Sequence, residues 1–134
     1  MVLVILIGLF IGFGMATKTF LKPENLINLT TQMAINAMLS AGLTYVIILG
    51  GIDISVGSVA ALAGIVATLV ASKFPNLSVP GSLVIILLSA LAVGGVCGSF
   101  NGIMITRFKV VPMIATLAML TIARGASFIV SGGT

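Results

Sequence analysis

The chain contains few charged residues. Six are Lys or Arg and two are Asp or Glu among 134 residues, so charged side chains make up 6% of the sequence. Soluble domains carry about 25%. Histidine is absent, which removes the most frequent catalytic base and a principal metal ligand. A single cysteine, Cys97, leaves no intrachain disulfide. The sequence therefore predicts no metal site and leaves little for a catalytic site of the kind found in soluble enzymes.

Apolar residues take the place of the missing charge. The chain is 60% hydrophobic, with a mean hydropathy of +1.38. A chain of this composition cannot solvate its own surface, so the sequence predicts an integral membrane protein in contact with the lipid bilayer. The net charge of +4 comes from scattered basic residues without interleaved aromatic residues. This pattern argues against binding of nucleic acid.

The apolar residues fall into five segments. A helix that spans a bilayer needs about 20 mainly apolar residues, and the segments approach or exceed that length: Val2–Ala16, 26–49, 56–71, 83–106 and 113–130. Short stretches that contain Lys, Pro or Gly separate them and are expected to be loops: 17–24, 72–80 and the end of the chain from 131. The prediction is an all-α, polytopic transmembrane helical bundle that forms a single membrane domain over residues 1–134. The basic residues near the segment ends do not decide its orientation.

Asp53 is an acidic residue between two long uncharged stretches, 25–52 and 54–72. A carboxylate at the centre of a bilayer costs roughly 2.5–3.5 kcal/mol on insertion scales, so Asp53 needs polar partners, water or an aqueous face. The glycines around it interrupt a helix and expose backbone polar groups. The sequence predicts a break between the second and third segments that lines a path or cavity. The residues assigned to it are Gly50, Gly51, Asp53, Ser55, Gly57 and Ser58.

Two roles are compatible with the position of Asp53. It immediately precedes the third segment, whose first helical residue is expected to be Ser55 or Val56. This position favours a role like that of a helix N-cap, in which the carboxylate accepts hydrogen bonds from backbone N–H groups freed by the glycines. Direct contact with a solute is the alternative.

Three further polar residues within the apolar segments are candidates for the site. Asn36 and Asn101 each need a partner, since an unpaired amide in an apolar setting costs about 2–7 kcal/mol. Each either forms an interhelical hydrogen bond or lines a pathway. Arg124 lies twelve residues after Pro112, about 18 Å along a helix axis. It either reaches the membrane interface, with the helix ending at Gly125, or turns inward to pair with Asp53 or face a cavity.

Gly94, Gly98 and Gly102 recur every four residues in the fourth segment. This spacing places them on one face of a helix and lets another helix approach closely. Helix packing is therefore the favoured role for these glycines.

The residues 50–58, Gly-Gly-Ile-Asp-Ile-Ser-Val-Gly-Ser, are followed by Ala-Ala-Leu-Ala-Gly at 60–64. Together they resemble the signature of the ribose-type permeases of ABC sugar importers, in the branched-chain amino acid/ribose permease family. Further stretches match the family in the expected order: 24–28, 38–44, 101–102, 112–117 and 121–125. The resemblance covers nearly the whole chain.

The resemblance implies an all-helical, multi-pass protein of the bacterial inner (cytoplasmic) membrane, roughly twice as long as this chain, with its N-terminus inside. Two copies, or two related subunits, form the path in such importers. A periplasmic or extracellular sugar-binding protein delivers the monosaccharide. Cytoplasmic ABC ATPase subunits bind ATP and Mg²⁺ and drive alternating access, so no cofactor is expected in this chain. The family's cytoplasmic coupling loop has no counterpart here, and the chain is therefore expected to be the N-terminal part of a permease.

The expected function is that of a membrane-spanning permease subunit of an ATP-driven importer for a monosaccharide or related small polar solute. ATP hydrolysis is expected on a separate partner chain, and the permease itself is not expected to be an enzyme. A small helical scaffold or interaction subunit without transport activity is the alternative. A membrane-embedded enzyme is disfavoured because the two acidic residues, Glu24 and Asp53, are 29 positions apart and lie in different contexts.

Overall fold

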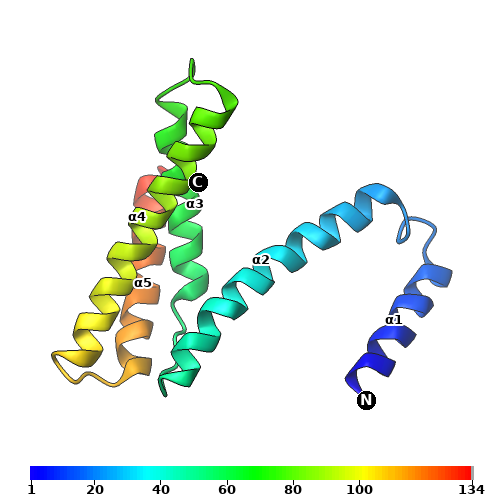
Figure 1. Cartoon of the computed structure of the whole chain (residues 1–134), viewed down its shortest axis with the longest axis horizontal. Coiled ribbons are helices and arrows are strands. Elements are labelled where there is room, and N and C mark those ends of the chain that lie inside the picture. Colours follow the sequence, from blue (N-terminus) through cyan, green and yellow to red (C-terminus); the bar gives the residue numbers. More distant parts are fainter. Residues whose placement is uncertain (134) are drawn as a thin grey trace. The chain divides into compact units, whose positions relative to one another are not determined.

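The computed structural model describes residues 1–133, and all regular secondary structure in this range is helical (Figure 1). The helices are α1 Val2–Ala16, α2 Pro23–Ile48, α3 Val56–Ser72, α4 Val79–Thr106 and α5 Pro112–Val130. By length and composition α2, α4 and α5 can cross a membrane, while α1 and α3 are shorter apolar helices. The predicted all-α fold class and the break between the second and third segments are confirmed.

Two predicted loops are shorter in the structure, and the first of them is 17–24, because α2 begins at Pro23. The stretch 72–80 was expected to be a loop because of its prolines, but α4 begins at Val79, with Pro80 in its first turn. Proline is tolerated there because the first N–H groups of a helix have no partner within the helix. Pro112 occupies the same kind of position at the start of α5. The prolines thus mark helix starts, and the loop between α3 and α4 is confined to residues 73–78.

The chain divides into two units, the first of which is Met1–Gly42. It contains α1, the turn after it and the first part of α2. The ring of Phe20 in this turn lies edge-on to Phe10, with centroids 5.1 Å apart, and stacks on Phe13 at 5.9 Å. The side-chain amide of Asn25 donates a hydrogen bond of 2.8 Å to the carbonyl oxygen of Phe20. These contacts fix the turn between the two helices.

The second unit begins at Leu43 and contains α3, α4 and α5 side by side (Figure 1). Its buried core consists of Leu62 from α3, Cys97 from α4, and Met119 and Ala123 from α5. Two of these core residues, Cys97 and Ala123, are small. Small residues allow helices in membrane bundles to pack closely.

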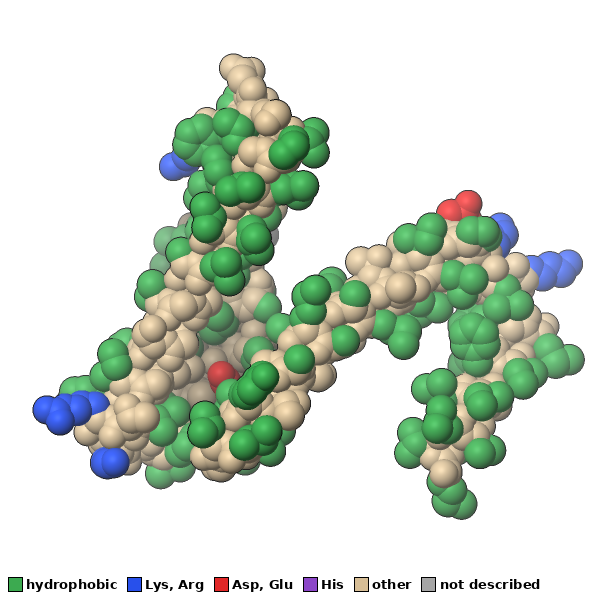
Figure 2. Space-filling view, viewed as in Figure 1, with side chains coloured by type: hydrophobic (Ala, Val, Ile, Leu, Met, Phe, Trp, Pro, Cys, Tyr) green, Lys and Arg blue, Asp and Glu red, His purple; other side chains and the backbone are tan. Residues whose placement is uncertain are grey.

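Large hydrophobic side chains remain exposed along every helix. Figure 2 shows them spread over the helices, while Lys and Arg gather at the helix ends on the face shown. This distribution is typical of a surface that faces lipid, since lipid tails solvate apolar side chains and the charged groups remain at the interfaces.

Candidate functional site

The break between α2 and α3 begins at two glycines. The Gly50 N–H donates to the carbonyl oxygen of Ile47 at 2.9 Å, and the Gly51 N–H donates to that of Val46 at 3.0 Å. Gly50 has a φ of +76°, a left-handed conformation that favours glycine because it has no Cβ. This geometry closes the C-terminus of a helix. Gly50 and Gly51 therefore end α2 and release the chain into the irregular segment that leads to α3.

The side chain of Asp53 contacts Ser55, which lies two positions further along the chain at the start of α3. One carboxylate oxygen of Asp53, Oδ1, accepts a hydrogen bond of 2.7 Å from the Ser55 N–H and one of 2.6 Å from the Ser55 hydroxyl. Ser55 is the N-cap of α3 and is 1% exposed. The carboxylate was expected to reach the N–H groups near the glycines, including Gly57 and Ser58. It binds the N-cap residue instead, because it lies two positions before Ser55 and closes a local turn there.

Asn101 connects α4 to the start of α3. Its Nδ2 donates to the Ser55 Oγ at 3.3 Å, over a separation of 46 residues. Because the Ser55 proton goes to Asp53, the Ser55 oxygen is the acceptor in this bond. The Oδ1 of Asn101 is buried without a partner among the described residues. Of the two roles left open for Asn101, the structure provides the interhelical hydrogen bond, and Asn101 also lines a hollow beside the break.

Thr116 of α5 also binds the break and was not among the residues expected at the site. Its hydroxyl is 3.2 Å from the carbonyl oxygen of Ile52 and 3.3 Å from that of Met113. Thr116 is 2% exposed. The bond to Ile52 satisfies a carbonyl group that the break removes from helical hydrogen bonding. A hydroxyl in the second turn of an apolar helix is the signal that could have identified it. We call Asp53, Ser55, Asn101 and Thr116 the break network.

A hollow of about 510 Å³ opens beside the break network, lined in part by Asp53, Asn101 and Thr116. Gly98 and Gly102 of α4 face it as well. A Cβ placed on Gly94, Gly98 or Gly102 would meet no other atom within 4 Å. The glycine face is thus uncovered within the described chain, and its packing against another helix stays a prediction.

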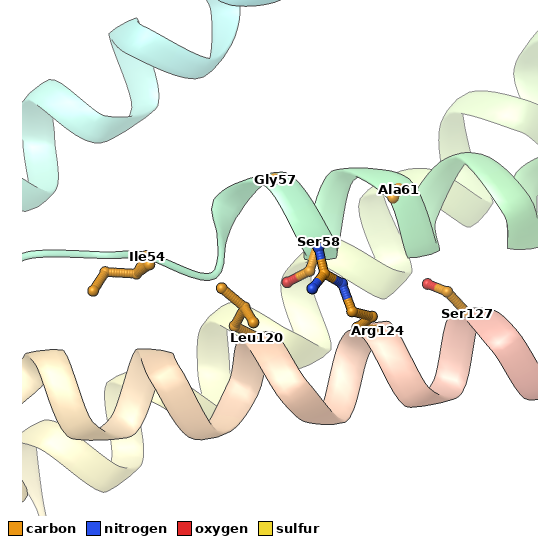
Figure 3. Close-up of a pocket in the computed structure, with 7 residues that line it drawn as sticks. All are labelled: Ile54, Gly57, Ser58, Ala61, Leu120, Arg124 and Ser127. Atoms are coloured by element: carbon orange, nitrogen blue, oxygen red, sulfur yellow. The ribbon is translucent and has the colours of Figure 1, made fainter.

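A second hollow, of about 300 Å³, lies between α3 and α5. We call it the arginine hollow, and its lining includes Ser58 and Ala61 from α3 with Leu120, Arg124 and Ser127 from α5. Figure 3 shows the Arg124 side chain extending from α5 toward Ser58. Helix α5 continues to Val130, so it does not end at Gly125.

The structure separates several residues that the sequence grouped. Arg124 lines the arginine hollow, whereas Asp53 lines the hollow at the break, so the cavity-facing position of Arg124 is the one observed. Gly57 and Ser58 line the arginine hollow as well. Asn36 is exposed and belongs to the first unit, and its role stays a prediction.

The chemistry available in the second unit is hydrogen bonding. Carboxylate, hydroxyl and amide groups of the break network, and the guanidinium of the arginine hollow, can replace water around a polar solute. Within residues 1–133 there is no group of three or more His, Cys, Asp or Glu side chains that could hold a metal ion. Both hollows place polar groups of this kind beside apolar side chains.

Comparison with known proteins identifies relatives of the chain. A family model described as "Branched-chain amino acid transport system / permease component" matches residues 25–134. The ribose import permease protein of Haemophilus influenzae is 35% identical over 131 residues, which cover 98% of this chain and 38% of that protein. The ribose import permease protein of Bacillus subtilis is 39% identical over 130 residues, 95% of this chain and 38% of its own length.

A third relative is the galactofuranose transporter permease protein of Escherichia coli. It is 40% identical over 116 residues, which cover 87% of this chain and 31% of that protein. The chain spans less than two fifths of the length of these relatives, so the expectation of roughly twice its length was too low. No solved structure matches the chain significantly.

Proposed function

The chain belongs to the branched-chain amino acid transport system / permease component family, and on this basis we propose that it acts as the membrane-spanning permease subunit of an ATP-driven importer for a monosaccharide or a related small polar solute. The names of its relatives support a sugar as the solute, since two of them import ribose and one transports galactofuranose. The observation that carries the proposal is the break network, a group of hydrogen-bonded polar side chains inside an apolar helix bundle.

A sugar loses its water when it crosses hydrocarbon, and the lost hydrogen bonds need replacement. Asp53 and Asn101 line the hollow at the break together with Thr116. They supply a carboxylate, an amide and a hydroxyl, which between them donate to and accept from sugar hydroxyl groups. Polar side chains inside a membrane bundle mark solute pathways in this way.

In this proposal the chain performs no covalent chemistry. A separate cytoplasmic ABC ATPase binds ATP and Mg²⁺ and drives alternating access. A second permease subunit completes the path, and a periplasmic or extracellular sugar-binding protein delivers the solute. The site of action is the bacterial cytoplasmic membrane, which the protein crosses several times.

The test is uptake by the assembled transporter in proteoliposomes, with the candidate ATPase and binding protein present. We expect ATP-dependent accumulation of at least one radiolabelled sugar from a panel of D-ribose, L-arabinose, D-fructose and D-galactose. A hydrolysis-deficient ATPase serves as the control and should abolish accumulation. Absence of accumulation for every sugar, together with ATPase activity that the loaded binding protein does not stimulate, would contradict the proposal.

A scaffold without transport activity is the second candidate, favoured by the uncovered glycine face of α4. Such a face suits close packing against a partner helix. The scaffold proposal predicts that a transporter assembled without this chain still accumulates the sugar. The permease proposal predicts that accumulation then falls to the background level.

A further inference from the structure

Arg124 carries hydrogen-bond donors into an apolar helix. It lies twelve residues after Pro112 and six residues before Val130, the two ends of α5, which corresponds to about 18 Å and about 9 Å along the axis. A guanidinium has five N–H donors and no acceptor. The residues that line the arginine hollow include no Asp or Glu. The exposed Arg124 side chain borders the hollow, so its donors are available to a molecule that enters the hollow.

Ser58 and Ser127 present acceptors to the same hollow. The Ser58 hydroxyl donates its proton to the carbonyl oxygen of Ser55 at 2.8 Å, and the Ser127 hydroxyl donates to that of Ala123 at 2.8 Å. Each hydroxyl has one proton and two acceptor lone pairs. Because each hydroxyl proton is donated to a nearby backbone carbonyl oxygen, the lone pairs of each serine oxygen remain for a ligand. Figure 3 shows both serines beside the Arg124 side chain, one on α3 and one on α5.

A ligand that fits this arrangement has to accept hydrogen bonds from Arg124 and donate them to the serines. A hydroxyl group does both, because its oxygen accepts while its proton is donated. A carboxylate or a fully ionised phosphate only accepts, and its oxygens would face the serine lone pairs. The hollow, at about 300 Å³, is at the small end of the range of roughly 300–1,000 Å³ for ligand pockets. The small Gly57 and Ala61 leave room on the α3 side.

We infer that the arginine hollow binds two neighbouring hydroxyl groups of the imported monosaccharide. The Arg124 guanidinium donates to both hydroxyl oxygens, and the hydroxyl protons are donated to Ser58 and Ser127. The planar fork of arginine suits two adjacent oxygens. This inference rests on the proposed function and assigns the solute specificity of the importer to a subsite between α3 and α5.

The first experiment compares Arg124→Gln with wild type in the assembled transporter. The probes are the sugar of the panel that wild type accumulates fastest and its series of monodeoxy analogues. We expect Arg124→Gln to raise the KM for uptake about tenfold or more, as for loss of hydrogen bonds from a charged donor. Wild type should discriminate against analogues that lack either of two adjacent hydroxyl groups, and the variant should lose most of this discrimination. Arg107→Gln, at the exposed C-terminal end of α4, is the matched control and should retain both properties.

A second pair of variants tests the hollow itself, so that poor folding of Arg124→Gln does not decide the matter. Ala61→Leu places a larger side chain in the arginine hollow, while the neighbouring Ala60, also exposed, does not line it. We expect Ala61→Leu to lower uptake at least tenfold at unchanged membrane abundance, and Ala60→Leu to resemble wild type.

Unchanged KM and unchanged deoxy-sugar discrimination in Arg124→Gln would overturn the inference, as would normal uptake by Ala61→Leu. Either result leaves the proposed function standing, because wild type would still accumulate the sugar. Absence of wild-type uptake for the whole panel would instead overturn the proposed function and the inference with it.

Discussion

Removal of one hydroxyl group, in Ser55→Ala, should lower the stability of the helix bundle around α3. In the structure this hydroxyl donates to Asp53 Oδ1 at 2.6 Å and accepts from Asn101 Nδ2 at 3.3 Å. Loss of a hydrogen bond to a charged group costs about 1.5–3 kcal/mol, and a buried polar group left without a partner costs about 1–3 kcal/mol. Because such terms are not additive in a shared network, we expect a total loss of about 2–4 kcal/mol in the stability of the second unit.

Cys97 provides the assay. It is the single cysteine of the chain and lies buried in the core with Leu62, Met119 and Ala123. A thiol reagent therefore labels it only when the bundle opens, provided that opening and closing are fast relative to labelling. A loss of about 2–4 kcal/mol corresponds to labelling about 30- to 700-fold faster. The measurement uses detergent-solubilised protein at a fixed reagent concentration.

Ser89→Ala is the control for this prediction. The Ser89 hydroxyl is half-buried on α4 and bonds only to carbonyl groups of its own helix, at 2.6 Å and 3.0 Å. Its removal leaves no interhelical partner unpaired, so the labelling rate of Cys97 should change little. The reasoning fails if Ser55→Ala labels no faster than Ser89→Ala, since the break network would then contribute nothing to the packing of α3.

Three further variants address the break and the glycine face. Asp53→Asn keeps an acceptor for Ser55, so the cap-like role predicts near-normal membrane abundance and a modest loss of uptake. Asp53→Ala should be lower in both membrane abundance and uptake. Complete loss of uptake in Asp53→Asn at normal abundance would assign the carboxylate to the solute instead. Gly50→Ala forces a side chain into a φ of +76° and should cost about 1–2 kcal/mol, measured by Cys97 labelling, whereas Gly42→Ala inside α2 should not destabilise. Gly98→Leu should reduce cross-linking of the chain to its partner helices in the assembled transporter, and normal assembly would contradict the packing role of the glycine face.

The sequence predicted the helices well because their lengths depend on local composition. Long apolar stretches between Lys, Pro and Gly residues identify spans without reference to tertiary structure, and the first helix, Val2–Ala16, agrees at both ends. The starts of α2 and α4 were misplaced because Pro23 and Pro80 were read as loop residues, although a proline is permitted in the first turn of a helix. Gly50 was expected to interrupt a helix because glycine adopts conformations that other residues avoid. Its positive φ confirms that reason.

The partners of the polar residues were harder to predict, because they depend on which helices pack together. The bond from Asn101 to Ser55 joins residues 46 positions apart, and the bond from Thr116 to Ile52 joins residues 64 positions apart. No local pattern specifies such pairs. The position of Arg124 in a hollow distinct from that of Asp53 likewise follows from the packing of α5 against α3.

The depth at which α3 begins explains why the break needs its network. The chain between Ile52 and Ser58 passes from the level of Thr116 on α5 to that of Arg124, as the bond to Thr116 and the lining of the arginine hollow indicate. These two residues of α5 are eight positions apart, or about 12 Å along its axis. The irregular backbone therefore lies within the length of the bundle. Non-helical backbone at membrane depth is tolerated only where protein buries it or where it lines a water-filled cavity.

The break satisfies backbone groups with side chains and also lines hollows. Thr116 satisfies the Ile52 carbonyl and Asp53 satisfies the Ser55 N–H, so these backbone groups do not face lipid unpaired. The same segment lines the hollow at the break through Gly51, Ile52 and Asp53, and the arginine hollow through Ile54. The side chains that make the break stable are therefore adjacent to the space through which a polar solute could pass. Asp53→Ala and Ser55→Ala should consequently change stability and uptake together, whereas Ala61→Leu should change uptake alone.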